Sequence, residues 1–381
     1  MQLSVACNWD PVLIENMNKL GVVDLYGRVK NDPYGGGRVE DDLSNFDYGK
    51  AKEYISEVKS RDMKFTYLFN TMTLSNDEFS DSGKKKIINY LEEIANLNVT
   101  TIAVTLPYLG ELIKKYVPHI KINVSILANV TSGTQAKYWD DLGAYSICLA
   151  YDVTRDFKAL KAIRKAVKCR LGLLVNDPCL YRCPDLFHHN MERSLSNKTC
   201  GSNSKKNYFY LRCSCSAMNN PTEFVRSMFV RPEDTSSYEE IGIDYFKIAE
   251  RLKSTRWLTN ATKASYDRAY EGNLADILTM YSQFDYQKKD AKPLTSDSLK
   301  NPEWMNEEFK DGNFLGFPYI DNQKLSEIEF LEFFKKHDCK NSTCDKVCKY
   351  CEKSAKEVVS FDNDRKKIVA DNLDLALDNS L

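Results

Sequence analysis

The sequence predicts an α/β fold, a (β/α)8 TIM barrel with a cysteine-rich insertion after strand seven and a small cysteine-rich C-terminal segment. Eight short runs of β-branched and aromatic residues recur through about the first 250 residues. Polar stretches with helical periodicity follow most of these runs, which is the pattern of β/α units around a parallel sheet. About 68 residues separate the seventh and eighth runs, far more than a usual connection.

The predicted elements alternate along the chain. Strands are expected at residues 3–9, 21–29, 64–70, 100–106, 121–130, 145–151, 170–176 and 245–251. Helices are expected at residues 11–20, 48–61, 82–97, 109–117, 136–142 and 155–167, and several begin at a capping residue or a proline. Eight units favour a closed barrel over an open doubly wound sheet, which is the alternative. No G-x-G-x-x-G motif follows the first predicted strand to mark the dinucleotide crevice of such a sheet.

The predicted barrel covers residues 1–285, and its insertion covers 177–242. Because the loops after strand C-termini build the active site of a TIM barrel, an insertion after strand seven should lie over the mouth. A long connection after strand two contains three consecutive glycines followed by Arg38. We interpret it as a lid or an anion-binding turn, with a plain loop as the alternative. Residues 286–381 are expected to form an accessory segment with an amphipathic helix near 324–337.

Composition limits the classes of function. The 53 basic and 54 acidic residues give a formal charge of -1, so no global field favours wrapping nucleic acid or lying on an anionic membrane. The first residues lack the features of a signal peptide and no apolar run is long enough to span a membrane, so we expect a cytoplasmic protein. In a reducing compartment, 12 cysteines indicate metal ligation or redox chemistry. Cys7, Cys148 and Cys169 stand alone in apolar segments and are expected in the core.

Five cysteines lie in the predicted insertion, and four thiolates gathered there would suit an Fe–S cluster or a tetrahedral zinc. A C-x3-C pair at the end of a strand, followed by a proline, favours the cluster, whereas zinc usually takes paired C-x2-C knuckles. Zinc and unligated cysteines are the alternatives. Cys179, Cys183 and one of Cys213 or Cys215 are the preferred ligands, with the fourth from Cys200 or the other member of the C-x-C pair.

A second group of four cysteines lies near the C-terminal end, with the spacing Cys339-x4-Cys344-x3-Cys348-x2-Cys351. Four cysteines within 13 residues can enclose one metal site, either a structural zinc or a second Fe–S cluster. Alternatively, the segment could donate one thiolate to the first cluster. The residues between these cysteines are polar, which argues against a small apolar core.

Several charged residues follow the predicted strands and can face the barrel mouth. Lys247 lies on the last predicted strand and Arg251 just beyond it. We expect them to neighbour a substrate or a cluster, with ion pairs of the barrel core as the alternative. His188 and His189 closely follow the C-x3-C pair and could neighbour a cluster, shuttle protons, contact substrate or simply begin a solvated helix. The candidate catalytic residues are Arg38, Asp152, Arg155, His188, Lys247 and Arg251.

Two blocks in the second half of the chain form a recognisable pattern. Residues 229–234 contain Arg-Pro-Glu-Asp, and residues 242–251 have the sequence GIDYFKIAER. They resemble a turn and the last barrel strand of the peptidase U32 family. The resemblance extends to Asn8-Trp9-Asp10, the glycine turn ending in Arg38, Asp152 with Arg155, and residues 176–184. It covers most of residues 1–285 and implies a TIM barrel with a four-cysteine [4Fe–4S] site. Members are implicated in oxygen-independent hydroxylation of ubiquinone precursors, transfer RNA or ribosomal RNA, and an older interpretation makes them collagenase-like peptidases.

We therefore expect an iron–sulfur redox enzyme that modifies a small molecule, a peptide or RNA at the barrel mouth, served by an electron donor or a partner protein. A U32-type peptidase is one alternative. The sequence has no G-x-S-x-G elbow, no H-E-x-x-H motif and no papain-like cysteine context, and its four histidines leave little room for hydrolytic machinery. A non-catalytic binding or accessory protein of a biosynthetic pathway is the other alternative.

Overall fold

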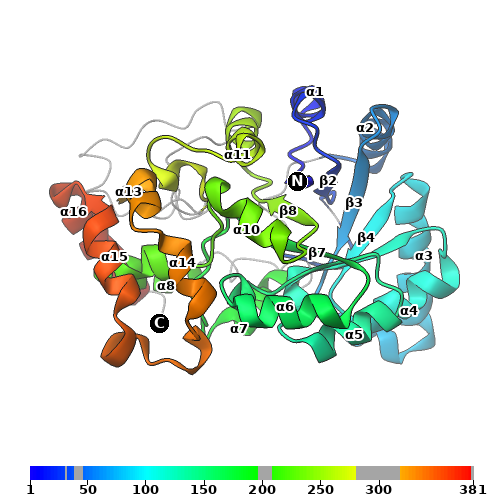
Figure 1. The fold of residues 1–381 in the computed structure, drawn as a ribbon. Coiled ribbons are helices and arrows are strands. Elements are labelled where there is room, and N and C mark those ends of the chain that lie inside the picture. The colour runs from blue at the N-terminus through cyan, green and yellow to red at the C-terminus, as the bar shows by residue number, and fades with distance from the viewer. Residues whose placement is uncertain (31, 38–45, 196–207, 280–317, 379–381) are drawn as a thin grey trace.

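The computed structural model describes residues 1–30, 32–37, 46–195, 208–279 and 318–378. Within them, eight parallel strands close into a barrel, because each strand pairs with the next along the chain and β8 pairs with β1 (Figure 1). The barrel strands are β1 (Leu3–Ala6), β2 (Asp24–Gly27), β3 (Lys64–Phe69), β4 (Thr101–Val104), β5 (Lys121–Val124), β6 (Ser146–Cys148), β7 (Arg170–Leu174) and β8 (Tyr245–Ile248). The predicted TIM barrel is confirmed, and the open sheet is wrong.

Helices cover the outside of the barrel, and the first six lie where the sequence predicts them. They are α1 (Pro11–Lys19), α2 (Tyr48–Ser60), α3 (Asp81–Asn96), α4 (Pro107–Tyr116), α5 (Gly133–Asp141) and α6 (Phe157–Ala166), and α11 (Thr255–Asp267) follows β8. Side-chain caps fix several starts: Asp10, Ser80 and Asp156 each accept a hydrogen bond from a backbone N–H of the first turn. None of the helices in the described ranges combines the length and apolar composition of a membrane span.

The insertion after β7 and the C-terminal segment pack against each other beside the barrel. Described residues of the insertion form α7 (Leu186–Leu195), α8 (Tyr208–Asn219), α9 (Thr222–Arg226) and α10 (Thr235–Glu240). The C-terminal segment forms β9 (Pro318–Ile320), α13 (Asn322–Glu327), α14 (Phe330–Lys336), α15 (Tyr350–Val358), β10 (Val359–Phe361) and α16 (Asn363–Asp378). Helix α16 lies on α8, α15 on α9 and α14 on α6, so this segment, orange and red in Figure 1, docks on both the insertion and the barrel.

Two sequence predictions need correction. The single helix predicted near 324–337 is two short helices, because Glu329 adopts a left-handed conformation (φ 49°) that ends α13 before α14 begins. Cys7 and Cys148 are buried as expected, but Cys169 is only half-buried at the start of β7. There its backbone N–H donates to a carboxylate oxygen of Asp140.

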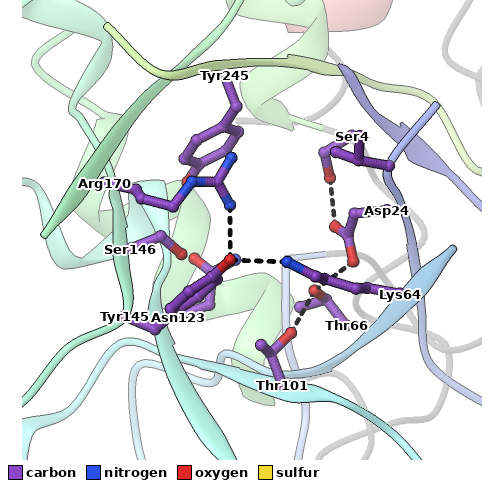
Figure 2. A pocket seen from close by; sticks show the side chains of 11 residues that line it. Ser4, Asp24, Lys64, Thr66, Thr101, Asn123, Tyr145, Ser146, Arg170 and Tyr245 are labelled. Atoms are coloured by element: carbon purple, nitrogen blue, oxygen red, sulfur yellow. Dashed lines mark hydrogen bonds between the residues drawn. The ribbon is translucent and has the colours of Figure 1, made fainter. Parts of the chain in front are cut away.

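The floor of the barrel, at the N-terminal ends of the strands, is polar (Figure 2). Asp24 accepts hydrogen bonds from Ser4 and Thr66 at 2.6 and 2.8 Å, and the Tyr145 hydroxyl accepts from Lys64 and from an arginine on β7. These side chains line a cavity of about 20 Å³, enough for about one water. TIM barrels usually fill this interior with branched apolar residues, so the polar floor is a departure that the strand patterns did not predict.

Candidate metal centre

The loop after β7 is fixed to the C-terminal end of the barrel. Asn176 bridges to the next strand, because its amide donates to the Ala249 carbonyl (2.7 Å) and accepts from the Ala249 N–H (2.8 Å). Asp177 accepts hydrogen bonds from the hydroxyls of Tyr151 (2.8 Å) and Thr279 (2.9 Å). The cysteines that follow therefore start from a rigid position at the barrel mouth.

Three insertion thiols lie together at this end of the barrel. Burial raises the pKa of Cys179, and Asp177, Cys183 and Cys213 raise it further because these groups are close by. Burial likewise raises the pKa of Cys213 to about 12, with Cys183 adding to the increase. Arg193 of α7 acts in the opposite direction on Cys179 and Cys213, so a positive charge lies beside the group. We call Cys179, Cys183 and Cys213 the insertion thiols.

The structure distinguishes the two members of the C-x-C pair. Both lie on α8, where residues two apart face different directions. Burial raises the pKa of Cys215 to about 12, and the next contributions come from Asp374 of α16 rather than from another thiol. Cys215 therefore faces the C-terminal helix, and Cys213 is the member that joins the insertion thiols. Cys200, the other predicted ligand, lies outside the described residues.

The four C-terminal cysteines form a separate group, which we call the C-terminal thiols. Cys339 lies in a 3-10 turn, Cys344 and Cys348 in a π-helical turn, and Cys351 in the first turn of α15. All four are free thiols and line one cavity of about 20 Å³. Burial raises the pKa of Cys339 to about 12, and the other three thiols add to the increase because they lie within electrostatic range.

The short segment between Cys179 and Cys183 lies between the two thiol groups. Tyr181 lines a cavity of about 30 Å³ together with three of the C-terminal thiols. Arg182 has a left-handed backbone (φ 53°), donates its N–H to Asp152 (3.0 Å) and its guanidinium to the Lys340 carbonyl (3.2 Å). The predicted residue Asp152 thus holds this segment against the C-terminal thiols instead of facing the inside of the barrel.

Arg155 lies in the same contact region and not at the barrel mouth where the sequence analysis placed it. Its side chain is buried, donates to the Val225 carbonyl (2.6 Å) and lies 4.4, 5.0 and 5.1 Å from the ring centroids of Phe229, Phe330 and Phe334. Two of these rings belong to α14, so Arg155 joins the C-terminal segment to the barrel. Its positive charge also lowers the pKa of the nearby Cys351, whose thiol is otherwise made less acidic by burial.

Lys247 lies inside the barrel. Its amine is 3.8 Å from the ring centroid of Tyr26, and the Tyr26 hydroxyl donates to the Ile248 carbonyl (2.9 Å). Burial lowers the pKa of Lys247, although Cys148 opposes this change, and Arg251 is close enough to lower it further. Lys247 therefore places an amine at the centre of the barrel near Arg251.

His188 and the glycine turn both pack against neighbouring helices of the insertion. His188 is exposed on α7, and its ring contacts Phe209 of α8 edge-on. In the glycine turn, a Cβ on Gly35 would lie 1.9 Å from the backbone oxygen of Ser194 at the end of α7. The turn is thus packed tightly against the insertion, while Arg38 lies outside the described residues.

The thiols of both groups are the type of donor that a sulfur-ligated metal needs. Their spacing in this structure, however, does not form a metal site. Among the described residues, no three His, Cys, Asp or Glu side chains form a group that could hold a metal ion as they are placed. Two sets of soft thiols nevertheless lie together, each beside an arginine and each half-buried. Arg193, Tyr181 and Arg226 were not among the predicted site residues, and only Tyr181, between Cys179 and Cys183, lies close to cysteines in the sequence.

Comparison with known proteins identifies relatives of this chain. The family model described as peptidase family U32 matches residues 35–301. The uncharacterized protease MJ1657 of Methanocaldococcus jannaschii is 26% identical over 297 residues, which cover 78% of this chain and 76% of that protein. Among solved structures, the U32 peptidase Mk0906 matches with a TM-score of 0.49 and 19% identity, covering 65% of this chain and 92% of the other. Phosphoribosyl anthranilate isomerase from Thermus thermophilus matches with a TM-score of 0.38 and 10% identity, covering 70% and 98%. The family match covers well over half of the sequence, and the chain belongs to peptidase family U32.

Proposed function

We propose that this protein is an iron–sulfur redox enzyme whose cluster is held by the insertion thiols, with Cys200 as the fourth ligand. One observation supports the proposal: Cys179 and Cys183 on the loop after β7 and Cys213 on helix α8, distant in sequence, lie within electrostatic range of one another near the C-terminal ends of the barrel strands. Thiolates are the usual ligands of Fe–S clusters, and active sites of TIM barrels lie at this end.

The surroundings of the insertion thiols favour a negatively charged cluster. Burial makes the free thiols weak acids, so a bound metal would have to displace their protons, as metal ligation does. Arg193 contributes a positive charge that would stabilise the resulting thiolates. Bound there, a [4Fe–4S] cluster would supply single-electron chemistry.

The residues of the barrel supply contacts for a substrate. Lys247 offers an amine above the Tyr26 ring, which suits an anionic group on a small molecule, a peptide or RNA. Tyr151 donates to Asp177 beside the insertion thiols, and this pair can hold or pass a proton at the phenolic oxygen. Oxygen-independent hydroxylation, as the family resemblance implies, is the reaction type that we propose. With water as the oxygen source, R–H and H2O would give R–OH, two protons and two electrons, and an external one-electron acceptor would take the electrons one at a time through the cluster.

The test is anaerobic purification followed by iron and acid-labile sulfide quantitation and a visible spectrum. We expect a brown wild-type protein, and a Cys179→Ala/Cys183→Ala variant that loses the cluster while its circular dichroism stays unchanged. Cys169→Ala is a matched control, because this half-buried cysteine lies at the opposite end of β7. A wild-type protein that contains zinc alone, or no metal after anaerobic purification, would refute the proposal.

A further inference from the structure

We propose that the polar space at the floor of the barrel binds one monatomic, monovalent anion, such as chloride. This space, which we call the floor cavity, lies at the N-terminal ends of the strands, away from the insertion thiols. The anion site is therefore independent of the iron–sulfur function proposed above. Three features of the cavity support an anion: the charge of its lining, the direction of its hydrogen-bond donors and its volume.

The lining of the floor cavity carries a net positive charge at neutral pH. Among the described residues that line it, Lys64 and Arg170 are the cationic side chains and Asp24 is the carboxylate. Asp24 is ionised above about pH 6, so two positive charges and one negative charge leave a net charge of +1. One monovalent anion would make the filled cavity neutral.

The charged side chains stand at the rim of the floor cavity, and neutral polar groups lie inside it. Lys64 and Arg170 are partly exposed, so solvent reaches the cavity past them, whereas Asn123, Ser146 and Tyr245 are buried. Cations at an opening raise the local concentration of anions. Neutral N–H and O–H groups can then bind an anion that has left the solvent.

Tyr145 is held with its phenolic hydrogen available to the cavity. Its oxygen accepts hydrogen bonds from Lys64 (2.8 Å) and Arg170 (3.1 Å), which leaves the hydrogen to donate to another group. Burial raises the pKa of this phenol, but the hydrogen bond from Lys64 and the charge of Arg170 outweigh burial and lower the pKa below its usual value. A more acidic phenol is a stronger donor to an anion.

Tyr245 of β8 supplies a second phenolic donor from inside the barrel. A Cβ on Gly172 of β7 would lie 2.2 Å from its ring, so the glycine leaves the space that the ring fills. Figure 2 shows the ring beside Arg170, whose guanidinium carbon is 5.1 Å from the ring centroid. The Tyr245 hydroxyl lies near Ser146, but among the described residues it makes no hydrogen bond of normal geometry. Because such a buried hydroxyl is costly, an anion that accepts its hydrogen would stabilise the fold.

The carboxylate of the cavity already has hydrogen-bond partners. Asp24 accepts from Ser4 (2.6 Å) and Thr66 (2.8 Å). The Thr66 hydrogen is thereby used, so Thr101 is the donor in the 2.5 Å hydrogen bond between these two threonines. A water molecule would need acceptors for its own two hydrogens, whereas an anion needs donors alone. The free donors of Tyr145 and Tyr245 therefore favour an anion over water.

The volume of the floor cavity limits the size of the anion. The cavity measures about 20 Å³, which is enough for about one water. Chloride and bromide are single atoms only slightly larger than a water oxygen. Sulfate, phosphate and carboxylate groups have several heavy atoms and would have to displace the lining. The site thus suits a halide and excludes the larger oxyanions.

Protonation of Asp24 should strengthen the binding. Burial raises its pKa to about 6, although its neighbours oppose the increase. Below this pH the negative charge of the lining is lost, so an anion should bind more tightly. By linkage, a bound anion raises the pKa of Asp24 in turn. The groups near Asp24 are two hydroxyls, two amines and a phenol, namely Ser4, Thr66, Lys64, Lys247 and Tyr245.

The first experiment locates the anion with bromide, which scatters X-rays anomalously. Crystals of the full-length protein are grown in sodium gluconate and then soaked in sodium bromide. We expect an anomalous peak in the floor cavity, within hydrogen-bond distance of the hydroxyls of Tyr145 and Tyr245. A water peak without anomalous signal, or no peak at all, would overturn the site.

The second experiment measures the effect of chloride in solution. Thermal unfolding is followed in sodium chloride and in sodium gluconate at equal ionic strength and neutral pH, because gluconate is too large for the cavity. Chloride should raise the Tm of wild type, and the rise should grow with the logarithm of its concentration. A bromide peak in the crystal without a chloride effect on Tm would mean binding at crystal concentration only, and would overturn the proposal.

Matched variants assign this effect to the floor cavity. Lys64→Gln and Tyr245→Phe should each raise the dissociation constant for chloride by about tenfold or more. Lys121→Gln is the control for the lysine, because the Lys121 amine lies 4.6 Å from the Tyr145 ring centroid but does not line the cavity. Tyr238→Phe is the control for the tyrosine, since it also removes a buried hydroxyl. Equal chloride effects in a variant and its control would overturn the assignment.

Asp24→Asn keeps the test decisive if a weakened variant does not fold. This substitution removes the negative charge of the lining, so chloride should bind about tenfold more tightly or better at neutral pH. The pH dependence of the chloride effect near pH 6 should also disappear. Asp141→Asn, at an exposed site on α5, should leave both unchanged. A chloride effect in Asp24→Asn no larger than that in wild type would overturn the proposal.

Discussion

Asp24 at the barrel floor allows a quantitative prediction. Its carboxylate accepts hydrogen bonds from Ser4 and Thr66 inside the barrel (Figure 2), and burial raises its pKa from 3.8 to about 6. Both hydrogen bonds and the amine of Lys247 oppose the effect of burial without cancelling it. Ionising Asp24 therefore costs more free energy in the folded protein than in the unfolded chain.

The sign of the pH dependence follows from this difference. When an acid has a higher pKa in the folded state, the folded state binds more protons between the two pKa values, and stability falls as the pH rises through that range. The contribution of Asp24 is neutral below about pH 3.8 and fully unfavourable above about pH 6. A pKa increase of this size corresponds to about 2–3 kcal/mol after allowance for solvent screening.

The assay is urea denaturation of wild type and Asp24→Asn from about pH 4 to about pH 7. Asparagine resembles the neutral acid, so the two proteins should have similar free energies of unfolding at the acidic end. At neutral pH the variant should be more stable by about 2–3 kcal/mol. Asp141→Asn, at an exposed site, controls for the general effect of removing a carboxylate. A stability difference that does not grow with pH would refute the assignment.

Other substitutions test the packing of the barrel core and of the insertion and C-terminal segment against it. Arg155→Met should lower the free energy of unfolding by about 2–4 kcal/mol, because it removes three cation–ring contacts and leaves the Val225 carbonyl without its donor. Arg155→Lys keeps the charge and should lose less stability. Equal losses in the two variants would contradict this role. Gly172→Ala should cost about 1–3 kcal/mol because its Cβ would lie 2.2 Å from the Tyr245 ring, and a double-mutant cycle with Tyr245→Leu should show strong coupling rather than additive losses. Gly35→Ala should displace α7 and reduce both thermal stability and iron content, whereas normal iron content would show that α7 does not position the insertion thiols.

The barrel could be predicted from sequence because its signals are local. Buried parallel strands leave short apolar runs such as residues 170–176, and the helices begin at side-chain caps such as Asp10 and Ser80. Observed strands are shorter than the predicted runs, because apolar residues beyond the ladder still pack in the core. The helix near 324–337 could not be divided by periodicity, since the break depends on the backbone conformation of Glu329 alone.

The candidate site could be predicted only in part, because it depends on contacts between distant segments. Both cysteine groups are visible in the sequence, but Cys213 and Cys215 are equivalent there, because the difference between them follows from the helical phase of α8. The position of Arg155 after strand six predicts a place at the barrel mouth. Its burial against two rings of α14 is a long-range contact that no local pattern shows.

Two cysteines on one helix provide the most direct test of the central claim that the insertion thiols hold an iron–sulfur cluster. Cys213→Ala and Cys215→Ala differ by two positions on α8, yet only Cys213 lies with the other insertion thiols. Iron and sulfide should be quantified in both variants after anaerobic purification, next to wild type. We expect Cys213→Ala to lose the iron and sulfide of the cluster at the insertion thiols and Cys215→Ala to keep the wild-type content. Equal iron content in the two variants, or loss in Cys215→Ala alone, would contradict it.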